Sequence, residues 1–224
     1  MGKKSLFSDD GKEALQYLRD VKKLDNKTIN QFDLGYVPGY VKNLYGDRHE
    51  FASRLVIPVY NQYNDLLVIS SRDWREDAYQ KFLHEQFDKK FYLYALNVAK
   101  PSILKYSKAV LVEGEFDVIT SHQYGITCTV GVLGSAPQLN QIAILARYCR
   151  EMYVIFDGDP AGAAATEKLM KLSRDFQLRD IYGITIIPVN LPEKVDPDDL
   201  LRDSGKAAFI ELMKQSKENS EWLK

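Results

Sequence analysis

Apolar runs alternate with helix-like stretches over the second half of the chain, from Lys108 onward. The runs are rich in Val, Ile and Leu, and they predict strands at 109–112, 128–132, 152–156 and 184–189. The stretches between them have helical spacing of apolar residues and cover 117–124, 136–149 and 161–176. Continuous apolar strands separated by helices are typical of a parallel sheet that is covered on both faces. We therefore expect an α/β fold in which helices flank a parallel sheet.

The first half of the chain has a mixed pattern of short elements. In chain order it predicts two short helices, a loop rich in turn residues and the two strands of a hairpin, at 10–20, 24–29, 34–40, 54–60 and 66–70. Pro58 suits an edge or irregular strand, because proline cannot donate a ladder hydrogen bond. We expect a smaller mixed α+β subdomain first, then the α/β domain, then a C-terminal helix, over 1–104, 105–204 and 205–224.

Composition narrows the class of protein only slightly. The chain has 224 residues, 45% of them hydrophobic, and a formal net charge of −1. It has neither the long apolar run of a membrane span nor a secretory signal at the N-terminus, so we expect no membrane association and a cytoplasmic location. Cys128 and Cys149 form no CxxC pair and lie near no histidine pair, so we expect no structural zinc. The net charge gives no nucleic-acid signal of its own.

Three acidic segments fall where predicted strands end or a late turn follows them. They are Glu113-Gly114-Glu115-Phe116-Asp117, Asp157-Gly158-Asp159-Pro160 and Asp196-Pro197-Asp198-Asp199. Groups beyond the carboxyl ends of parallel strands meet in one crevice, so we expect these carboxylates to lie together. Carboxylates crowded without a cation would have raised pKa values. Oxygen ligands without His or Cys select Mg²⁺ or Mn²⁺, and we expect two or more such ions.

Each segment alone also has a plain structural explanation. Asp-Gly-Asp is common in solvated turns, and the Asp196 segment suits the start of a helix, where carboxylates are favoured by the helix dipole. The occurrence of all three segments at predicted strand ends favours a shared site over three separate turns.

The three segments resemble the acidic motifs of TOPRIM domains, and most closely those of DnaG-type DNA primases. The resemblance extends upstream to Phe32–Pro38, to Arg54–Val59 and to Phe87–Leu96, so that it covers nearly the whole chain. It implies that Glu113 acts in acid/base chemistry and that Asp117 is the acid that closes the first motif. It further implies that divalent metal is bound by Asp157, Asp159, Asp196 and Asp198.

The same resemblance implies a nucleic-acid and nucleotide surface. Arg54, Arg72, Lys81 and Lys89 match basic positions of the family and become candidates for contacting template or triphosphate, where they would neutralise phosphate charge without reading sequence. A solvated surface position is the alternative for each of them. The implied partners are single-stranded DNA, nucleoside triphosphates, a replicative helicase and a separate zinc-binding subunit.

Departures from the family pattern leave the role of the chain open. DnaG-type primases usually carry a zinc-binding domain and a helicase-binding domain, which this sequence does not contain. The chain could be a catalytic core, a compact primase of a phage or mobile element, or one subunit of a split enzyme. The leading hypothesis is a primase core that makes RNA primers by metal-dependent nucleotidyl transfer. A metal-dependent nuclease and a non-catalytic nucleic-acid-binding module are the alternatives, whereas a topoisomerase would need a tyrosine domain for which there is little room.

Overall fold

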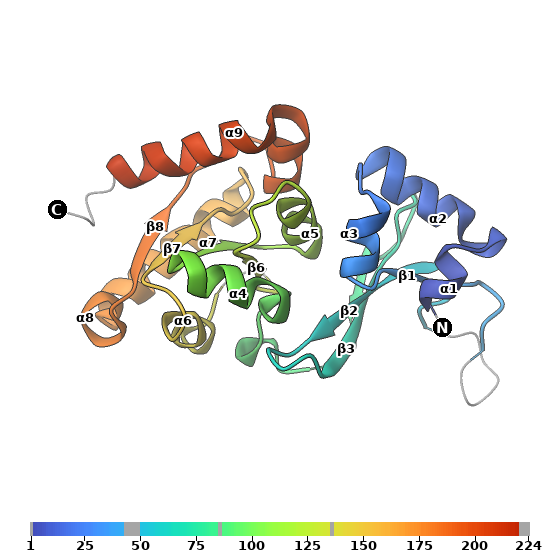
Figure 1. The fold of residues 1–224 in the computed structure, drawn as a ribbon, viewed down its shortest axis with the longest axis horizontal. Coiled ribbons are helices and arrows are strands. Elements are labelled where there is room, and N and C mark those ends of the chain that lie inside the picture. The colour runs from blue at the N-terminus through green and yellow to red at the C-terminus, as the bar shows by residue number, and fades with distance from the viewer. Residues whose placement is uncertain (1, 43–49, 85–86, 135–136, 220–224) are drawn as a thin grey trace. The chain divides into compact units, whose positions relative to one another are not determined.

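The computed structural model describes residues 2–42, 50–84, 87–134 and 137–219. The contacts within the chain divide it into two compact units. The first comprises Met1–Tyr60 and Asp65–Phe87, and the second comprises Asn61–Asn64 and Asp88–Lys224 (Figure 1). The boundaries at residues 104 and 204 stay a prediction.

The first unit contains a four-stranded antiparallel sheet in the order β1-β2-β3-β4. Its strands are β1 Gly35–Val37, β2 Arg54–Tyr60, β3 Leu66–Arg72 and β4 Phe82–His84. Its helical elements are α1 Gly2–Leu6, a short 3-10 helix Asp9–Gly11, α2 Lys12–Gln16, a short π-helix Tyr17–Val21 and α3 Asn26–Gln31. Asp25 caps α3 by accepting a hydrogen bond from the Thr28 amide at 2.6 Å. The predicted hairpin is thus present as β2 and β3.

Two expectations for this unit need correction. Gly35–Val37 is a strand rather than a loop, because it pairs with β2; three residues are too few to show a period of two in the sequence. The strand that holds Pro58 lies between β1 and β3, so the edge alternative is wrong, whereas a register shift between Val59 and Tyr60 agrees with the alternative of an irregular strand. Proline is tolerated there because β1 pairs with β2 only as far as Val56. No residue of β1 lies opposite Pro58, so the missing backbone N–H of Pro58 costs no hydrogen bond to β1.

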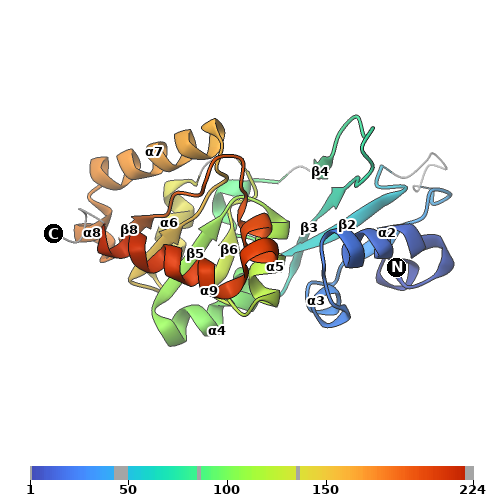
Figure 2. The ribbon, with the colours of Figure 1, turned by 90° about the horizontal axis from the view of Figure 1, so that it is seen from above.

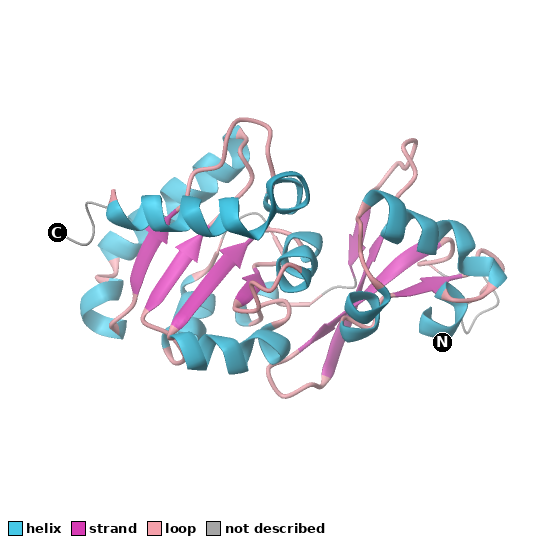
Figure 3. Ribbon diagram, turned by 45° about the horizontal axis from the view of Figure 1, so that its top comes forward, coloured by secondary structure: helices cyan, strands magenta, loops and turns pink. Residues whose placement is uncertain are grey.

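The second unit is built on a four-stranded parallel sheet in the order β6-β5-β7-β8. The strands are β5 Lys108–Val112, β6 Thr129–Gly131, β7 Glu151–Val154 and β8 Thr185–Pro188. The helices are α4 Leu96–Tyr106, α5 Glu115–Gln123, α6 Leu139–Ala146, α7 Pro160–Asp175, α8 Leu178–Tyr182 and α9 Pro197–Glu218, and a 3-10 turn, Lys89–Phe91, precedes them. α7 and α9 lie on opposite faces of the sheet (Figures 2 and 3).

Burial explains why the strand runs of this unit are continuously apolar. Ala109, Val110, Leu111 and Val112 of β5 are all fully buried, since helices cover both faces of the sheet. The expected α/β sheet flanked by helices, preceded by a smaller antiparallel unit, is confirmed.

Two helical features were not expected from the sequence. α4 contains Pro101 in its interior, which normally ends a helix, but the helix buries Leu96, Ala99 and Ile103 and so keeps its place. α9 begins at Pro197 and is interrupted at Gly205, whose φ of 76° is outside the helical region. The helix expected at the C-terminus is the part of α9 after this kink, and residues 220–224 lie outside the described part of the chain.

Within the described ranges, no helix combines the length and the apolar content that crossing a bilayer requires.

Candidate active site

The turn after β7 carries the second acidic segment and joins it to the third. Asp159 caps α7, accepting a hydrogen bond from the Gly162 amide at 2.8 Å, and Pro160 occupies the first turn of the helix. The Gly158 amide donates to the Val195 carbonyl at 2.8 Å, and the Lys194 amide donates to the Gly158 carbonyl at 2.7 Å. A side chain at Gly158 would place its Cβ 1.9 Å from the Pro192 carbonyl oxygen, so only glycine fits this close approach.

Glu113 links the first segment to the second. It follows β5, which pairs with β7 in parallel, so both strands deliver their next residues to the same edge of the sheet. The Asp157 amide donates to Glu113 Oε1 at 3.3 Å, which brings the two acids together across 44 residues of sequence.

Asp117 and Asp198 lie deeper, where the first turns of α5 and α9 meet. Asp117 is 8% exposed and accepts hydrogen bonds from the Gly114 amide at 2.9 Å and from the Asp198 amide at 3.3 Å. Asp198 is 1% exposed and accepts from the Thr120 hydroxyl at 2.6 Å. The Arg202 guanidinium, at 3.1 Å, completes the surroundings of Asp198.

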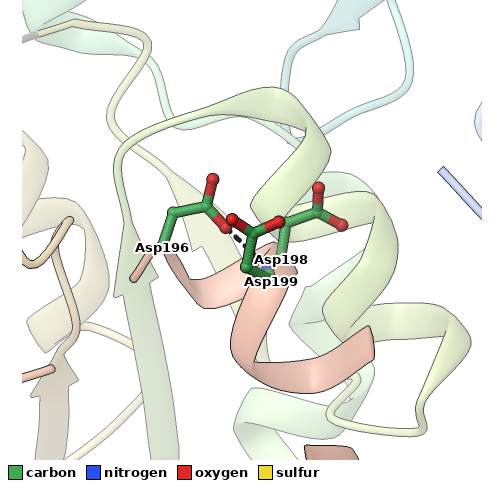
Figure 4. Close-up of side chains that lie close together, drawn as sticks. All are labelled: Asp196, Asp198 and Asp199. Carbon is green, nitrogen blue, oxygen red and sulfur yellow. Dashed lines mark hydrogen bonds between the residues drawn. The ribbon is translucent and has the colours of Figure 1, made fainter. Parts of the chain in front are cut away.

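The third segment gathers three carboxylates at the start of α9 (Figure 4). One ligand oxygen from each of Asp196, Asp198 and Asp199 lies within 4.8 Å of the others, which is compatible with a bound metal ion. Asp196 caps α9 by accepting from the Asp199 amide at 2.5 Å. Arg202 also forms an ion pair with Asp199, so this cluster contains one cation of its own.

The electrostatics of the acids differ from those of ordinary surface carboxylates. Burial raises the pKa of Glu113 to about 7, and the nearby Asp157 and Asp159 add to the effect. Burial likewise raises the pKa of Asp157 to about 6, with Asp196 as the next largest cause. Burial and then Asp157 raise the pKa of Asp117 well above its usual range. These groups are therefore held together at a cost that a cation would remove.

One buried carboxylate oxygen also indicates that the site requires a cation. Asp157 Oδ1 has no hydrogen-bond partner among the described residues. A cavity of about 390 Å³ adjoins Asp157 and Asp159, with Phe156, Ala163 and Leu191 in its apolar wall. The donor set is all oxygen, without His or Cys, which fits Mg²⁺ or Mn²⁺.

The sequence predicts that these acids lie together, and the structure brings Glu113 to Asp157 and Asp117 to Asp198, but their buried partners were not identified from the sequence. Thr120 and Arg202 were not singled out, although Arg202 is four residues after Asp198 on the same helix and Thr120 is three residues after Asp117. Asp199 was noted only as part of its segment. Helical spacing from a known acid is the signal that could have found all three.

The four basic candidates are divided between the units. Arg54, Arg72 and Lys81 belong to the first unit and Lys89 to the second. Arg54 is 9% exposed and donates to the Ser71 hydroxyl at 2.9 Å and to the carbonyls of Gln80 and Lys81 at 3.0 and 2.9 Å. The Arg72 guanidinium lies 4.7 Å from the centre of the Phe82 ring. Lys81 is exposed and Lys89 half-buried.

Residues 110–201 match the Toprim-like family. A DNA primase from Synechocystis is 31% identical to the chain in an alignment of 247 residues that covers 95% of this chain and 38% of the relative. A DnaG catalytic core has a TM-score of 0.86 to the structure at 26% identity, over 96% of this chain and 76% of that one. The chain is similar to Toprim-like domains over residues 110–201, and over most of its length it resembles the catalytic core of DnaG-type DNA primases.

A DnaG primase catalytic domain bound to single-stranded DNA is similar as well, with a TM-score of 0.83 and 26% identity over 96% of this chain and 77% of that one. All three acidic segments begin within the Toprim-like match. The chain spans well under half of the length of the Synechocystis relative.

Proposed function

We propose that this chain is the catalytic core of a DNA primase, which joins ribonucleoside triphosphates into a short RNA primer on single-stranded DNA. The observation that carries the proposal is the convergence of three acidic segments at one edge of the parallel sheet, where a buried oxygen of Asp157 has no hydrogen-bond partner in the part of the chain that the structure describes. The similarity to primase cores, one of them bound to single-stranded DNA, supports the choice of reaction and template.

Each acid then has a role. Asp157, Asp159 and Asp196 would hold the divalent ions, Mg²⁺ or Mn²⁺. When bound, these ions neutralise charge on the reacting phosphates and help to activate the 3′-hydroxyl. The 3′-oxygen forms a bond to the α-phosphorus, the bond to pyrophosphate breaks, and the proton passes to Glu113. Glu113 lies against Asp157 and can therefore reach a proton that is released at the metal site.

The basic residues divide into direct and indirect roles. We assign contacts with template or triphosphate to Arg72, Lys81 and Lys89. The side chain of Gln141, which is 1% exposed, donates to the Lys89 carbonyl at 3.2 Å and so fixes the backbone at Lys89. The protein bonds of Arg54 favour a supporting role for it, in which it holds the segment that presents Lys81. A helicase and a separate zinc-binding subunit are the protein partners that we propose.

A synthesis assay tests the proposal. The purified chain is incubated with Mn²⁺ or Mg²⁺, labelled ribonucleoside triphosphates and single-stranded DNA, with and without a separately expressed primase zinc-binding domain. We expect metal-dependent oligoribonucleotides, and a loss of roughly 100-fold or more in Glu113→Gln. Glu167→Gln, an exposed position on α7, is the matched control and should retain activity.

The alternatives predict other products. Cleavage of labelled DNA or RNA without synthesis would favour a nuclease. Absence of both activities, together with no Mn²⁺ uptake in calorimetry, would leave a non-catalytic nucleic-acid-binding module.

A further inference from the structure

The carboxylate of Asp198 is already surrounded by donors. Its Oδ1 accepts from the Thr120 hydroxyl at 2.6 Å and from Arg202 Nε at 3.1 Å, and its Oδ2 accepts from the second guanidinium nitrogen at 3.3 Å. A divalent ion on these oxygens would have to displace Arg202 or stay beside its positive charge, and two cations at such a distance repel each other. Asp157 Oδ1 has no such donor among the described residues.

The contacts of Asp117 complete a reciprocal link between two helices. Asp117 on α5 accepts from the Asp198 amide in the first turn of α9, whereas Asp198 on α9 accepts from Thr120 on α5. Thr120 is fully buried, and α5 and α9 pack against each other. The link therefore joins the two helix starts in both directions.

Each of these helix starts adjoins an acid of the site. Glu113 lies two residues before α5, and Asp196 is the cap of α9. Figure 4 shows Asp196 and Asp198 on either side of Asp199. A fixed junction of α5 with α9 consequently fixes the spacing between Glu113 and Asp196 before any ion binds.

We infer that Thr120 and Arg202 are positioning residues and that Asp198 is a brace between α5 and α9 instead of a metal ligand. The inference rests on the proposed function, because the brace serves the metal site formed by Asp157, Asp159 and Asp196 and the acid/base residue Glu113 beside it. Arg202 has a second effect, since its ion pairs with Asp198 and Asp199 place a positive charge beside these two carboxylates, which disfavours a divalent ion on them.

Titration of the full chain with Mn²⁺ alone, at pH 8 and without nucleotide or DNA, tests the brace. Thr120→Val removes the hydroxyl and preserves the shape of the side chain, and it should weaken Mn²⁺ binding roughly 10-fold, as for other outer-shell partners. Thr120→Ser keeps the hydroxyl and should restore binding. Ser121→Ala is the matched control, because Ser121 is the next residue of α5, is fully buried, and its hydroxyl has no partner among the described residues.

Two variants test whether Asp198 acts as a brace or as a metal ligand. Asp198→Asn keeps an acceptor for Thr120 and should keep Mn²⁺ uptake with a lower affinity, whereas Asp196→Asn should lose an ion or bind at least 100-fold more weakly, roughly the upper end for outer-shell changes. Equal losses in the two variants, or wild-type affinity in Thr120→Val, would overturn the inference.

Thermal unfolding without metal distinguishes failure of the brace from failure of the proposed function. The brace predicts that Thr120→Val and Asp198→Ala, which each remove the hydrogen bond between the two side chains, lower the unfolding temperature by several degrees and that their effects do not add in the double variant. If wild type takes up no Mn²⁺, the proposed function fails, and additive effects in this cycle would still refute the brace.

Discussion

Asp73 in the first unit and Asp157 in the second both lie within three residues of the end of a strand, but their surroundings are opposite. Asp73 is 7% exposed and lies 2.5 Å from a guanidinium nitrogen of Arg75 and 3.8 Å from one of Arg54. The hydrogen bond from Arg75 lowers the pKa of Asp73 against the effect of burial. Asp157 has carboxylates as its neighbours, and its pKa is raised to about 6. The comparison separates a carboxylate that its own unit neutralises from one that requires a cation from solution.

Removing the charge of Asp157 should have the largest effect. Asp157→Asn should weaken Mn²⁺ binding at least 100-fold, roughly the upper end of the range for outer-shell changes, and should abolish primer synthesis. In EDTA at pH 8 the same variant should unfold at a higher temperature than wild type, because an uncompensated buried charge is gone. Calorimetric titration and thermal melting measure both effects, with Asp175→Asn at the exposed end of α7 as control. A lower melting temperature in EDTA would show that Asp157 is compensated after all.

Acidity should change metal binding next most strongly. Protons compete with the cation for Glu113 and Asp157, whose pKa values are about 7 and about 6, so Mn²⁺ affinity should rise steeply from pH 5.5 to about 7.5 and then level off. Without metal, the folded state should instead become less stable as the pH rises. A carboxyl whose pKa is raised in the folded state stabilises that state at low pH, and this contribution is lost as the pH rises through 6 to 7. The melting temperature of wild type minus that of Glu113→Gln, followed from pH 4.5 to about 8.5, checks the sign.

Removing the charge of Asp73 should have the smallest effect, and one of opposite sign. Asp73→Asn leaves the buried Arg54 without its counter-charge and should lower the free energy of unfolding by about 1–3 kcal/mol. Urea unfolding measures the loss. Lys217→Ala, which breaks a partly exposed ion pair with Glu151, serves as a reference and should cost less than about 1 kcal/mol. Equal losses of unfolding free energy in the two variants would mean that the buried ion pairs of Asp73 stabilise the fold no more than the partly exposed pair does.

The sequence could predict much of the fold because the relevant signals are local. Continuous apolar runs marked the four parallel strands, and the convergence of Glu113 with Asp157 followed from the geometry of parallel strand ends. α4 was missed because Pro101 argues against a helix unless tertiary burial is known. β1 was missed because its partner strand lies far along the chain and its own length is only three residues.

The details of the site depended on contacts that no local pattern carries. Thr120 and Asp198 are 78 residues apart, and nothing near either residue indicates their hydrogen bond. The burial of Arg54 was equally hidden, since its partners are backbone carbonyls and a serine on other segments. Residue type and spacing identify which acids can meet, whereas the packing of α5 on α9 decides which of them still need a cation.

The kink at Gly205 divides α9 into two helical segments. The turns before it carry Asp196, Asp198 and Arg202, and the turns after it extend to Lys217, which pairs with Glu151 at the opposite end of β7. Nothing lies within 4 Å of the position that a Cβ at Gly205 would occupy, so its backbone conformation and not crowding requires glycine. Because the backbone of Gly205 is not helical, the direction of the turns after it is not set by the turns that carry the acids, and a change in the later turns need not rotate Asp196 or Asp198.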